Sequence, residues 1–131
     1  MYILDTNICI YVIKSRPLKV IEKFKTFNSS ELCISSITVA ELQYGVYKSQ
    51  YVERNMDALS MFLSPMEIFS FDDVAAYEYG IIRAQLEKSG NSIGAMDLLI
   101  AAHAKSIKAT IVTNNEREFS RISGINIENW V

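Results

Sequence analysis

Four acidic residues that are far apart in the chain each stand where a predicted strand has just ended or a predicted helix begins. They are Asp5, Glu41, Asp97 and Glu118. In an open parallel sheet, ligands bind beyond the carboxyl ends of the strands, so carboxylates at two such ends can face one crevice. Clustered carboxylates repel each other unless a cation lies between them, and hard divalent metals such as Mg2+ and Mn2+ prefer oxygen ligands. The placement therefore predicts one shared site with metal-dependent phosphate chemistry.

Each of these residues also has a purely structural interpretation. Asp5 could cap the helix that follows the first strand. Glu41 could be a solvated helix residue, or it could form a capping box with Thr38. Asp97 could be favoured by the helix dipole, although its neighbours in sequence are almost all apolar and charges are seldom buried unpaired. We expect the single histidine, His103, to pack or hydrogen-bond within the fold and to have no catalytic role.

The size and composition of the chain favour one folded domain over residues 1–131. A chain of 131 residues buries roughly two thirds of its unfolded surface, which is enough for a core of its own. The net charge of -2 lacks the basic excess of a nucleic-acid binder, so any such binding must be local or must go through metal ions. The N-terminus has no basic segment before a long apolar stretch, and no run approaches the ~18 apolar residues of a membrane helix, so we expect a cytoplasmic protein without membrane contact. Cys9 and Cys33 are then expected to be buried, reduced thiols.

Strand-like and helix-like segments alternate along the chain. This alternation predicts an α/β domain with a mostly parallel sheet and right-handed crossovers. The predicted strands cover residues 2–5, 32–34, 66–71, 110–113 and 125–127. The predicted helices cover residues 8–14, 17–27, 51–63, 96–107 and 116–121, with one more that Ser36 or Thr38 caps and another that Asp72 or Asp73 caps and that ends at Gly90.

Four segments of the chain resemble, in order and over its whole length, the successive motifs of the PIN-domain ribonucleases, in particular the VapC-type toxins of bacterial toxin-antitoxin pairs. The segments are Leu4–Asn7, Ser35–Gly45, Ile93–Ala101 and Val112–Phe119. The resemblance implies a three-layer α/β/α domain around a mostly parallel central sheet. It also implies a metal-dependent endoribonuclease that hydrolyses phosphodiester bonds in RNA.

Carried over residue by residue, the resemblance makes Asp5, Glu41 and Asp97 the acidic core that holds Mg2+ or Mn2+. Glu118 matches another acidic position of the family, and we include it among the catalytic residues and metal ligands. Many PIN domains have an aspartate where this chain has Asn115. An amide oxygen can still ligate a metal or hold a water bound to it, but it supplies no charge.

Other side chains near these motifs could support the site. The hydroxyls of Thr6 and Thr113 could orient carboxylates or water. An acidic site also needs cations nearby to hold an RNA backbone, because phosphate contacts dominate nucleic-acid affinity. Candidates for substrate binding are Arg117, Lys14 and Lys48, although each could be an ordinary solvated surface charge.

Tyr44, Tyr47 and Tyr51 lie close together after Glu41 in the sequence. Aromatic rings of this kind could stack on unpaired bases. At near-helical spacing they could equally belong to the core or to an interface.

The resemblance also implies partners. It implies a VapB-type antitoxin that inserts a segment near the active site, a toxin homodimer, a higher hetero-oligomer with the antitoxin, and contact with operator DNA only through the antitoxin. For VapC toxins the implied substrate class is tRNA, with the initiator tRNA anticodon loop as the candidate, so that cleavage would inhibit translation. The residues alone leave tRNA, ribosomal RNA and messenger RNA open, because folded RNA is recognised by its shape and its exposed loops.

Two further interpretations belong to different functional classes. A phosphatase of the haloacid dehalogenase kind also places an aspartate nucleophile after its first strand, but its usual second aspartate is Asn7 here. A non-catalytic module that binds RNA or protein could keep the fold while losing the metal. Asn115 makes this second alternative conceivable.

Overall fold

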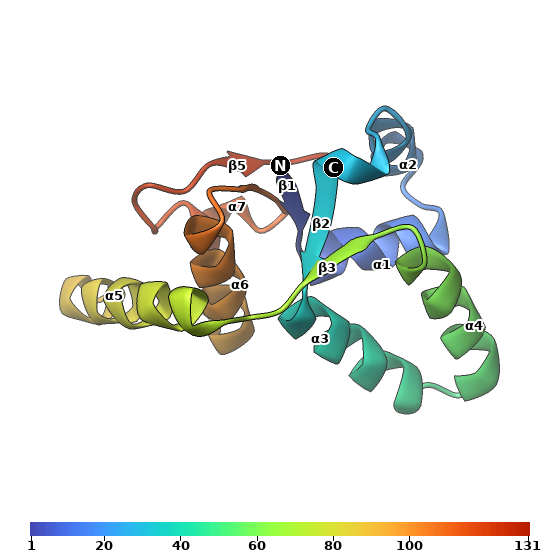
Figure 1. Cartoon of the computed structure of the whole chain (residues 1–131), viewed down its shortest axis with the longest axis horizontal. Coiled ribbons are helices and arrows are strands. Elements are labelled where there is room, and N and C mark those ends of the chain that lie inside the picture. The colour runs from blue at the N-terminus through green and yellow to red at the C-terminus, as the bar shows by residue number, and fades with distance from the viewer.

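The computed structural model describes residues 1–131, and a sheet of five strands forms its centre (Figure 1). The strand order is β3-β2-β1-β4-β5, and every neighbouring pair is parallel. The strands are β1 (Tyr2–Leu4), β2 (Leu32–Ser35), β3 (Glu67–Phe69), β4 (Thr110–Val112) and β5 (Ile127–Glu128). The α/β class is confirmed, and the sheet is parallel throughout.

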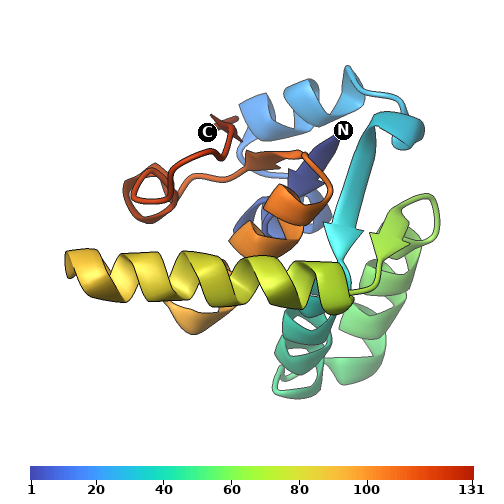
Figure 2. The ribbon, with the colours of Figure 1, turned by 60° about the vertical axis from the view of Figure 1, so that its left-hand side comes forward.

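Helices connect the strands and cover both faces of the sheet. They are α1 (Thr6–Lys14), α2 (Leu18–Lys25), α3 (Ser36–Tyr47), α4 (Val52–Leu63), α5 (Asp73–Ser89), α6 (Ala95–Ser106) and α7 (Glu116–Phe119), with a 3-10 turn η1 at Ser29–Glu31. Figure 2 shows the long α5 running across α6. No helix in the structure combines the length and the apolar character that a membrane crossing requires.

Two hydrophobic cores lie on opposite faces of the sheet, because successive side chains of a strand point to opposite sides. In β1, Ile3 belongs to the core shared with α5, α6 and α7, whereas Leu4 belongs to the core shared with α1, α2, α3 and α4. The expected three-layer arrangement is therefore confirmed. Cys9 and Cys33 are free and buried, as predicted.

Several boundaries differ from the sequence-based predictions, chiefly because other side chains cap the helices. The first helix begins at Thr6 and not at residue 8, since the Asp5 side chain accepts a hydrogen bond from the backbone N–H of Ile8. The prediction that Ser36 or Thr38 caps α3 was wrong. Ser35 is the cap and accepts from the N–H of Ile37 at 3.1 Å.

Ser36 and Thr38, the two residues predicted to cap α3, have other surroundings in the fold. The Ser36 hydroxyl accepts a hydrogen bond from the N–H of Phe71, 3.0 Å away, and so ties the start of α3 to the chain that leads into α5. The Thr38 hydroxyl is buried and has no hydrogen-bond partner.

The prediction of an Asp72 cap on α5 is confirmed. The last strand starts two residues later than predicted and is shorter, at Ile127–Glu128.

Candidate active site

Asp5 lies at the carboxyl end of β1 and is held from three sides. Its own N–H donates to the carbonyl of Val112 on the neighbouring strand, and one carboxylate oxygen accepts from the N–H of Ile8 at 3.0 Å. The hydroxyl of Thr113, directly after β4, donates to the other oxygen. The residue is only 3% exposed. Asp5 therefore is a helix cap, as the structural interpretation proposed, and also a nearly immobile buried carboxyl group.

Glu41 projects from the second turn of α3 toward the start of α1. The Thr6 hydroxyl donates to Glu41 Oε1 over 2.6 Å, which joins two residues 35 positions apart. A capping box with Thr38 is excluded, because Ser35 caps the helix and the Thr38 hydroxyl has no partner. The charge of Glu41 reaches Asp5, where it adds to the effect of burial on the pKa.

Asp97, Asn115 and Glu118 form a second cluster on the other side of Asp5. The Asn115 side-chain amide donates to Asp97 Oδ2 at 3.1 Å and to Glu118 Oε2 at 2.6 Å. The other oxygen of Glu118 accepts from the N–H of Gly94, 3.2 Å away, at the start of α6. One amide group thus bridges two carboxyl groups from two different helices.

Burial and mutual repulsion raise the pKa values of the deeper carboxyl groups. Loss of solvation is the main cause of the raised pKa at both Asp5 and Asp97. At Asp97 the pKa rises to about 7. Hydrogen bonding to Glu118 and the charges of Glu118 and Asp5 add to the rise at Asp97. The pKa of Glu118 is lowered, first by its hydrogen bond with Asp97 and then by that with Asn115. Asp97 is thus the member of the pair that keeps a proton near neutral pH.

The donor set suits a hard cation, although the side chains as they stand do not form a closed ligand shell. No three His, Cys, Asp or Glu side chains lie close enough together to hold an ion. Between the carboxyl groups lie the Thr113 hydroxyl and the Asn115 amide, and no lysine or arginine forms an ion pair with any of them. The available ligand atoms are all oxygens, which is the chemistry that Mg2+ and Mn2+ require. Asp5, Glu41, Asp97, Glu118 and the Asn115 oxygen are the residues that could hold such an ion.

The three basic residues suggested for substrate binding occupy different positions. Lys14 lines a groove together with Glu41. Lys48 caps the end of α3, with its Nζ 4.9 Å from the ring centroid of Tyr44. Arg117 is exposed on α7, and its guanidinium has no hydrogen bond or ion pair.

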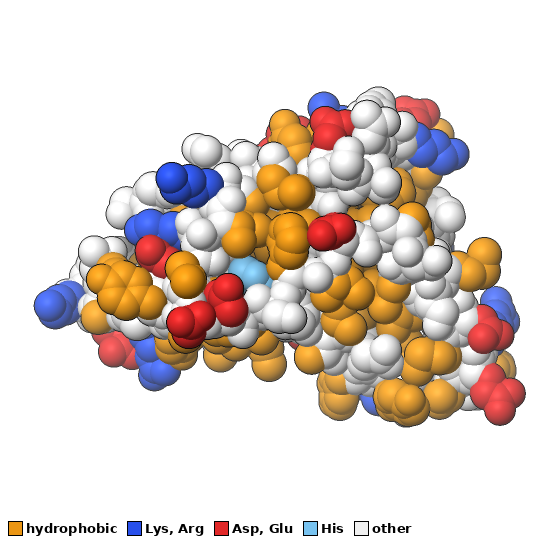
Figure 3. All heavy atoms as spheres, viewed as in Figure 1, with side chains coloured by type: hydrophobic (Ala, Val, Ile, Leu, Met, Phe, Trp, Pro, Cys, Tyr) orange, Lys and Arg blue, Asp and Glu red, His pale blue; other side chains and the backbone are white.

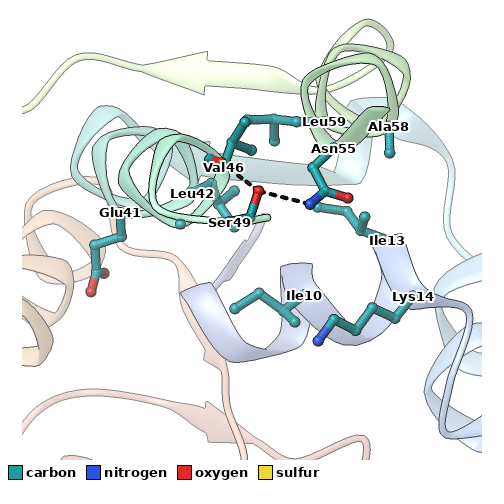
Figure 4. A pocket seen from close by; sticks show the side chains of 11 residues that line it. Ile10, Ile13, Lys14, Glu41, Leu42, Val46, Ser49, Asn55, Ala58 and Leu59 are labelled. Carbon is teal, nitrogen blue, oxygen red and sulfur yellow. Dashed lines mark hydrogen bonds between the residues drawn. The ribbon is translucent and has the colours of Figure 1, made fainter. Parts of the chain in front are cut away.

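A groove with a mainly apolar lining lies beside Glu41 (Figure 4). It runs between α1, α3 and α4 and encloses about 290 Å³. Figure 4 shows Glu41 at one edge of the groove and Lys14 on the α1 side. The hydrogen bond from Asn55 to Ser49, 2.9 Å long, closes the groove between α3 and α4. Its apolar lining includes Ile10, Ile13, Leu42, Val46 and Leu59.

The sequence did not reveal two contacts that hold the site together. Arg121 donates to the carbonyl of Ser92 at 2.9 Å, and the N–H of Gly94 donates to Glu118. Together they bind the segment before α6 to the region of α7. Only the second contact has a general signal in the sequence, because the free backbone N–H groups at the start of any helix need acceptors. His103 is buried, with Nδ1 2.7 Å from the Ser35 hydroxyl, as expected for a residue that hydrogen-bonds within the fold.

Comparison with known proteins agrees with this architecture. The sequence profile of the PIN domain matches residues 2–125. The chain is 49% identical over 130 residues to "Ribonuclease VapC2" of Haemophilus influenzae, covering 99% of this chain and 98% of that protein. It is 46% identical over 129 residues to "tRNA(fMet)-specific endonuclease VapC" of Shigella flexneri, covering 98% and 97%. A solved structure of DNA-bound VapBC from Salmonella typhimurium superposes with a TM-score of 0.94 at 47% identity, covering 99% of this chain and 98% of that one. The chain therefore belongs to the PIN-domain family, as a relative of the VapC ribonucleases.

Proposed function

We propose that this protein is the toxin of a type II toxin-antitoxin pair and an endoribonuclease that hydrolyses phosphodiester bonds with the help of Mg2+ or Mn2+. The observation that carries the proposal is the pairwise proximity of carboxyl groups near the carboxyl end of β1, where the charge of Glu41 acts on Asp5 and the charges of Asp5 and Glu118 act on Asp97. No lysine or arginine forms an ion pair with any of these groups. Two of these groups have raised pKa values, chiefly because burial disfavours their charged forms and also because neighbouring carboxyl groups repel them, and a bound cation would favour the charged forms. The ribonuclease names of its full-length relatives agree with this chemistry.

The residues of the chain have separate roles in the proposed reaction. When bound, a divalent ion supplies Lewis acidity, making water more acidic and neutralising charge on the phosphate. Asp5 is the fixed ligand, because two donors and burial hold its carboxyl group in one orientation. Thr6 fixes Glu41 through one carboxylate oxygen and leaves the other oxygen without a hydrogen bond from the protein. Asp97 must release its proton to act as a ligand, and this makes cation binding dependent on pH.

The Asn115 amide has a different role from an aspartate at the same position. Its NH2 group donates to both Asp97 and Glu118 and partly offsets their repulsion. Ligation through its oxygen requires the amide to turn over. The N–H of Gly94 donates to one oxygen of Glu118 and keeps it occupied.

The groove between α1, α3 and α4 supports the proposal of an antitoxin partner. A solved relative is a VapBC complex bound to DNA. We expect a VapB-type antitoxin to lay an apolar segment in the groove and to reach Glu41 at its edge (Figure 4). We also expect a toxin homodimer, a higher hetero-oligomer with the antitoxin, and contact with operator DNA through the antitoxin only.

The proposed substrate is tRNA, with the anticodon loop of initiator tRNA as the first candidate. The Shigella flexneri relative carries tRNA(fMet) in its name. The chain has net charge -2 and so lacks an overall basic excess, and we expect recognition to depend on a few local contacts and on unpaired nucleotides. A cytoplasmic location would follow from this substrate.

The decisive experiment is to incubate the antitoxin-free protein with total bacterial RNA, in Mg2+ or in EDTA, and to map the new RNA ends by sequencing. Asp5→Asn removes the buried carboxylate, and Asp57→Asn, at an exposed position on α4, is the matched control. We expect discrete cuts with wild type and with the control, only in Mg2+, and none with Asp5→Asn. Cuts that need neither the ion nor Asp5 would refute the proposal.

The same preparation separates the two other functional classes. A phosphatase with an aspartate nucleophile would hydrolyse p-nitrophenyl phosphate, and membership of the PIN-domain family argues against this activity. A non-catalytic module would bind RNA without cutting it, and its binding would not depend on Asp5 or Asp97.

A further inference from the structure

One face of α3 carries Glu41, Tyr44 and Lys48 in a row. Residues three and four apart are neighbours on a helix surface, so Tyr44 lies next to Glu41 and Lys48 lies next to Tyr44. Tyr44 is 66% exposed, although a tyrosine ring usually gains from burial. The ammonium of Lys48 lies 4.9 Å from the centre of its ring. The row begins at the candidate active site and runs outward along the helix.

We propose that Tyr44 and Lys48 form a binding subsite for an unpaired nucleotide of the RNA, next to the bond that is cut. The Tyr44 ring stacks on the base, and the Lys48 ammonium contacts a phosphate. This inference rests on the proposed ribonuclease function and adds to it a place where the substrate is held.

Electrostatics require cations at the edge of this site. Four carboxyl groups repel the phosphates on either side of the cut bond, so the RNA backbone must be held by positive charge outside the cluster. Lys14 lines the groove on the α1 side of Glu41, and Lys48 lies beyond it on α3. The chain has only 13 lysines and arginines and is acidic overall. We therefore expect Lys14 and Lys48 each to contribute to the affinity for the RNA backbone.

The surroundings of Tyr44 leave room for a base. Tyr44 is 66% exposed, so most of its surface is free of contact with the rest of the protein. A rise of about 1.5 Å per residue places Tyr44 about 4.5 Å further along the helix axis than Glu41, within reach of a nucleotide next to the cut bond. The Lys48 ammonium lies over one face of the Tyr44 ring, where it could contact the phosphate of a nucleotide whose base stacks on the opposite face.

A second tyrosine on the same helix provides the contrast. Tyr47 is 67% exposed, nearly the same as Tyr44, but it borders a hollow with Glu53 and Asp57 of α4. These acidic neighbours would repel an RNA backbone. Figure 3 shows hydrophobic side chains gathered over the ends of α3 and α4, at the lower right. Because Tyr44 and Tyr47 are almost equally exposed, their exposed fractions alone do not distinguish the two rings. Tyr47 is therefore the matched control.

The test measures binding without cleavage. All variants are made in the Asp5→Asn background and assayed in EDTA, with fluorescently labelled initiator tRNA and with a fully paired RNA duplex of similar length. Anisotropy titrations give the Kd values, and thermal melts followed by circular dichroism check that each variant is folded. We expect Tyr44→Ala to weaken tRNA binding roughly 5- to 150-fold, the effect of losing one base stack.

The remaining variants define the chemistry of the subsite. Tyr44→Phe keeps the ring and should bind like the parent, and Tyr47→Ala should also bind like the parent. Lys48→Met keeps the apolar stem and should reduce the slope of log Kd against log salt by about 0.7, the value for one phosphate contact on a single strand. Binding of the paired duplex should not respond to Tyr44→Ala, because its bases are not free to stack on the ring.

Four results would overturn the subsite. Equal weakening by Tyr44→Ala and Tyr47→Ala would show a general surface effect, and unchanged tRNA affinity of Tyr44→Ala would show that the ring does not touch RNA. A change of Tyr44→Ala from dimer to monomer in light scattering would assign the ring to contact with a second copy of the chain. If Tyr44→Ala in the otherwise wild-type protein cuts RNA normally in Mg2+, the subsite fails while the nuclease stands. Absence of any cutting by wild type refutes the proposed function itself.

Discussion

Replacing Asp97 with asparagine should stabilise the metal-free protein at neutral and alkaline pH. The substitution keeps the shape of the side chain and an oxygen that can accept from the Asn115 amide. It removes a carboxyl group whose pKa rises from 3.8 to about 7 on folding, mainly because of burial and then because of Glu118. The new amide can also donate to Glu118, which keeps that side chain paired.

The size of the effect follows from this shift in pKa. Between about pH 4 and pH 7 the folded protein binds more protons at Asp97 than the unfolded chain does, so wild-type stability falls as the pH rises through this window. A shift of this size corresponds to roughly 4 kcal/mol at 1.36 kcal/mol per pKa unit for a fully buried group. Asp97 is only half-buried, and screening by solvent reduces the expected difference to about 1 to 2 kcal/mol.

Urea denaturation in EDTA at a series of pH values measures this difference. The free energy of unfolding of Asp97→Asn should match that of wild type at pH 4 and exceed it by about 1 to 2 kcal/mol at pH 8. The exposed Asp57→Asn should show a difference within about 0.5 kcal/mol that does not vary with pH. Saturating Mn2+ should reduce or reverse the advantage of Asp97→Asn, since an ion that binds the folded wild type stabilises it. A constant difference across the pH range, or a less stable mutant at pH 8, would refute the reasoning.

Three further predictions concern the same site. Asp5→Asn should abolish cleavage and cellular toxicity while the protein stays folded, and full activity of the folded mutant would contradict the ligand assignment. Asn115→Asp should tighten Mn2+ binding in calorimetry, whereas Asn114→Asp next to it should not, and equal affinities would exclude residue 115 as a ligand. Thr6→Val removes the 2.6 Å hydrogen bond to Glu41, so cleavage should fall about 10-fold or more, with a loss of stability near 1 kcal/mol in urea denaturation; unchanged kcat/KM would show that Glu41 needs no support.

The order of the elements could be predicted because their patterns are local. Apolar runs bounded by turns identified all five strands, and the sheet proved parallel as the alternation with helices required. Helix starts were less predictable where several hydroxyl residues follow one another. Ser35, Ser36 and Thr38 are all suitable caps by type, and only the packing of β2 against its neighbours decides which hydroxyl faces the free N–H groups.

The candidate site residues could be proposed from the sequence, but their contacts could not. The positions of Asp5 and Asp97 beside buried segments predicted that they lie near each other, and the structure brings them close enough for the charge of Asp5 to raise the pKa of Asp97. The hydrogen bond from Thr6 to Glu41 joins residues 35 positions apart, and that from Thr113 to Asp5 joins residues 108 positions apart. Such pairings depend on strand order and helix direction, which no local pattern contains. The bridging by Asn115 could not be foreseen, because an amide offers either its oxygen or its NH2 group.

The groove proposed for the antitoxin has a floor that also belongs to the hydrophobic core. Leu42, Val46 and Leu59 line the groove and are at the same time buried members of the core on that face of the sheet. If the antitoxin binds this groove, a mutation of these residues that weakens antitoxin binding would also remove packing from the core. Truncation of a buried leucine to alanine costs about 2 to 5 kcal/mol of stability. That loss is a large fraction of the stability of a domain of this size. Mutations in the groove that abolish antitoxin binding would therefore also destabilise the toxin and lower its activity. Toxin variants that are both active and insensitive to the antitoxin would rarely arise by this route.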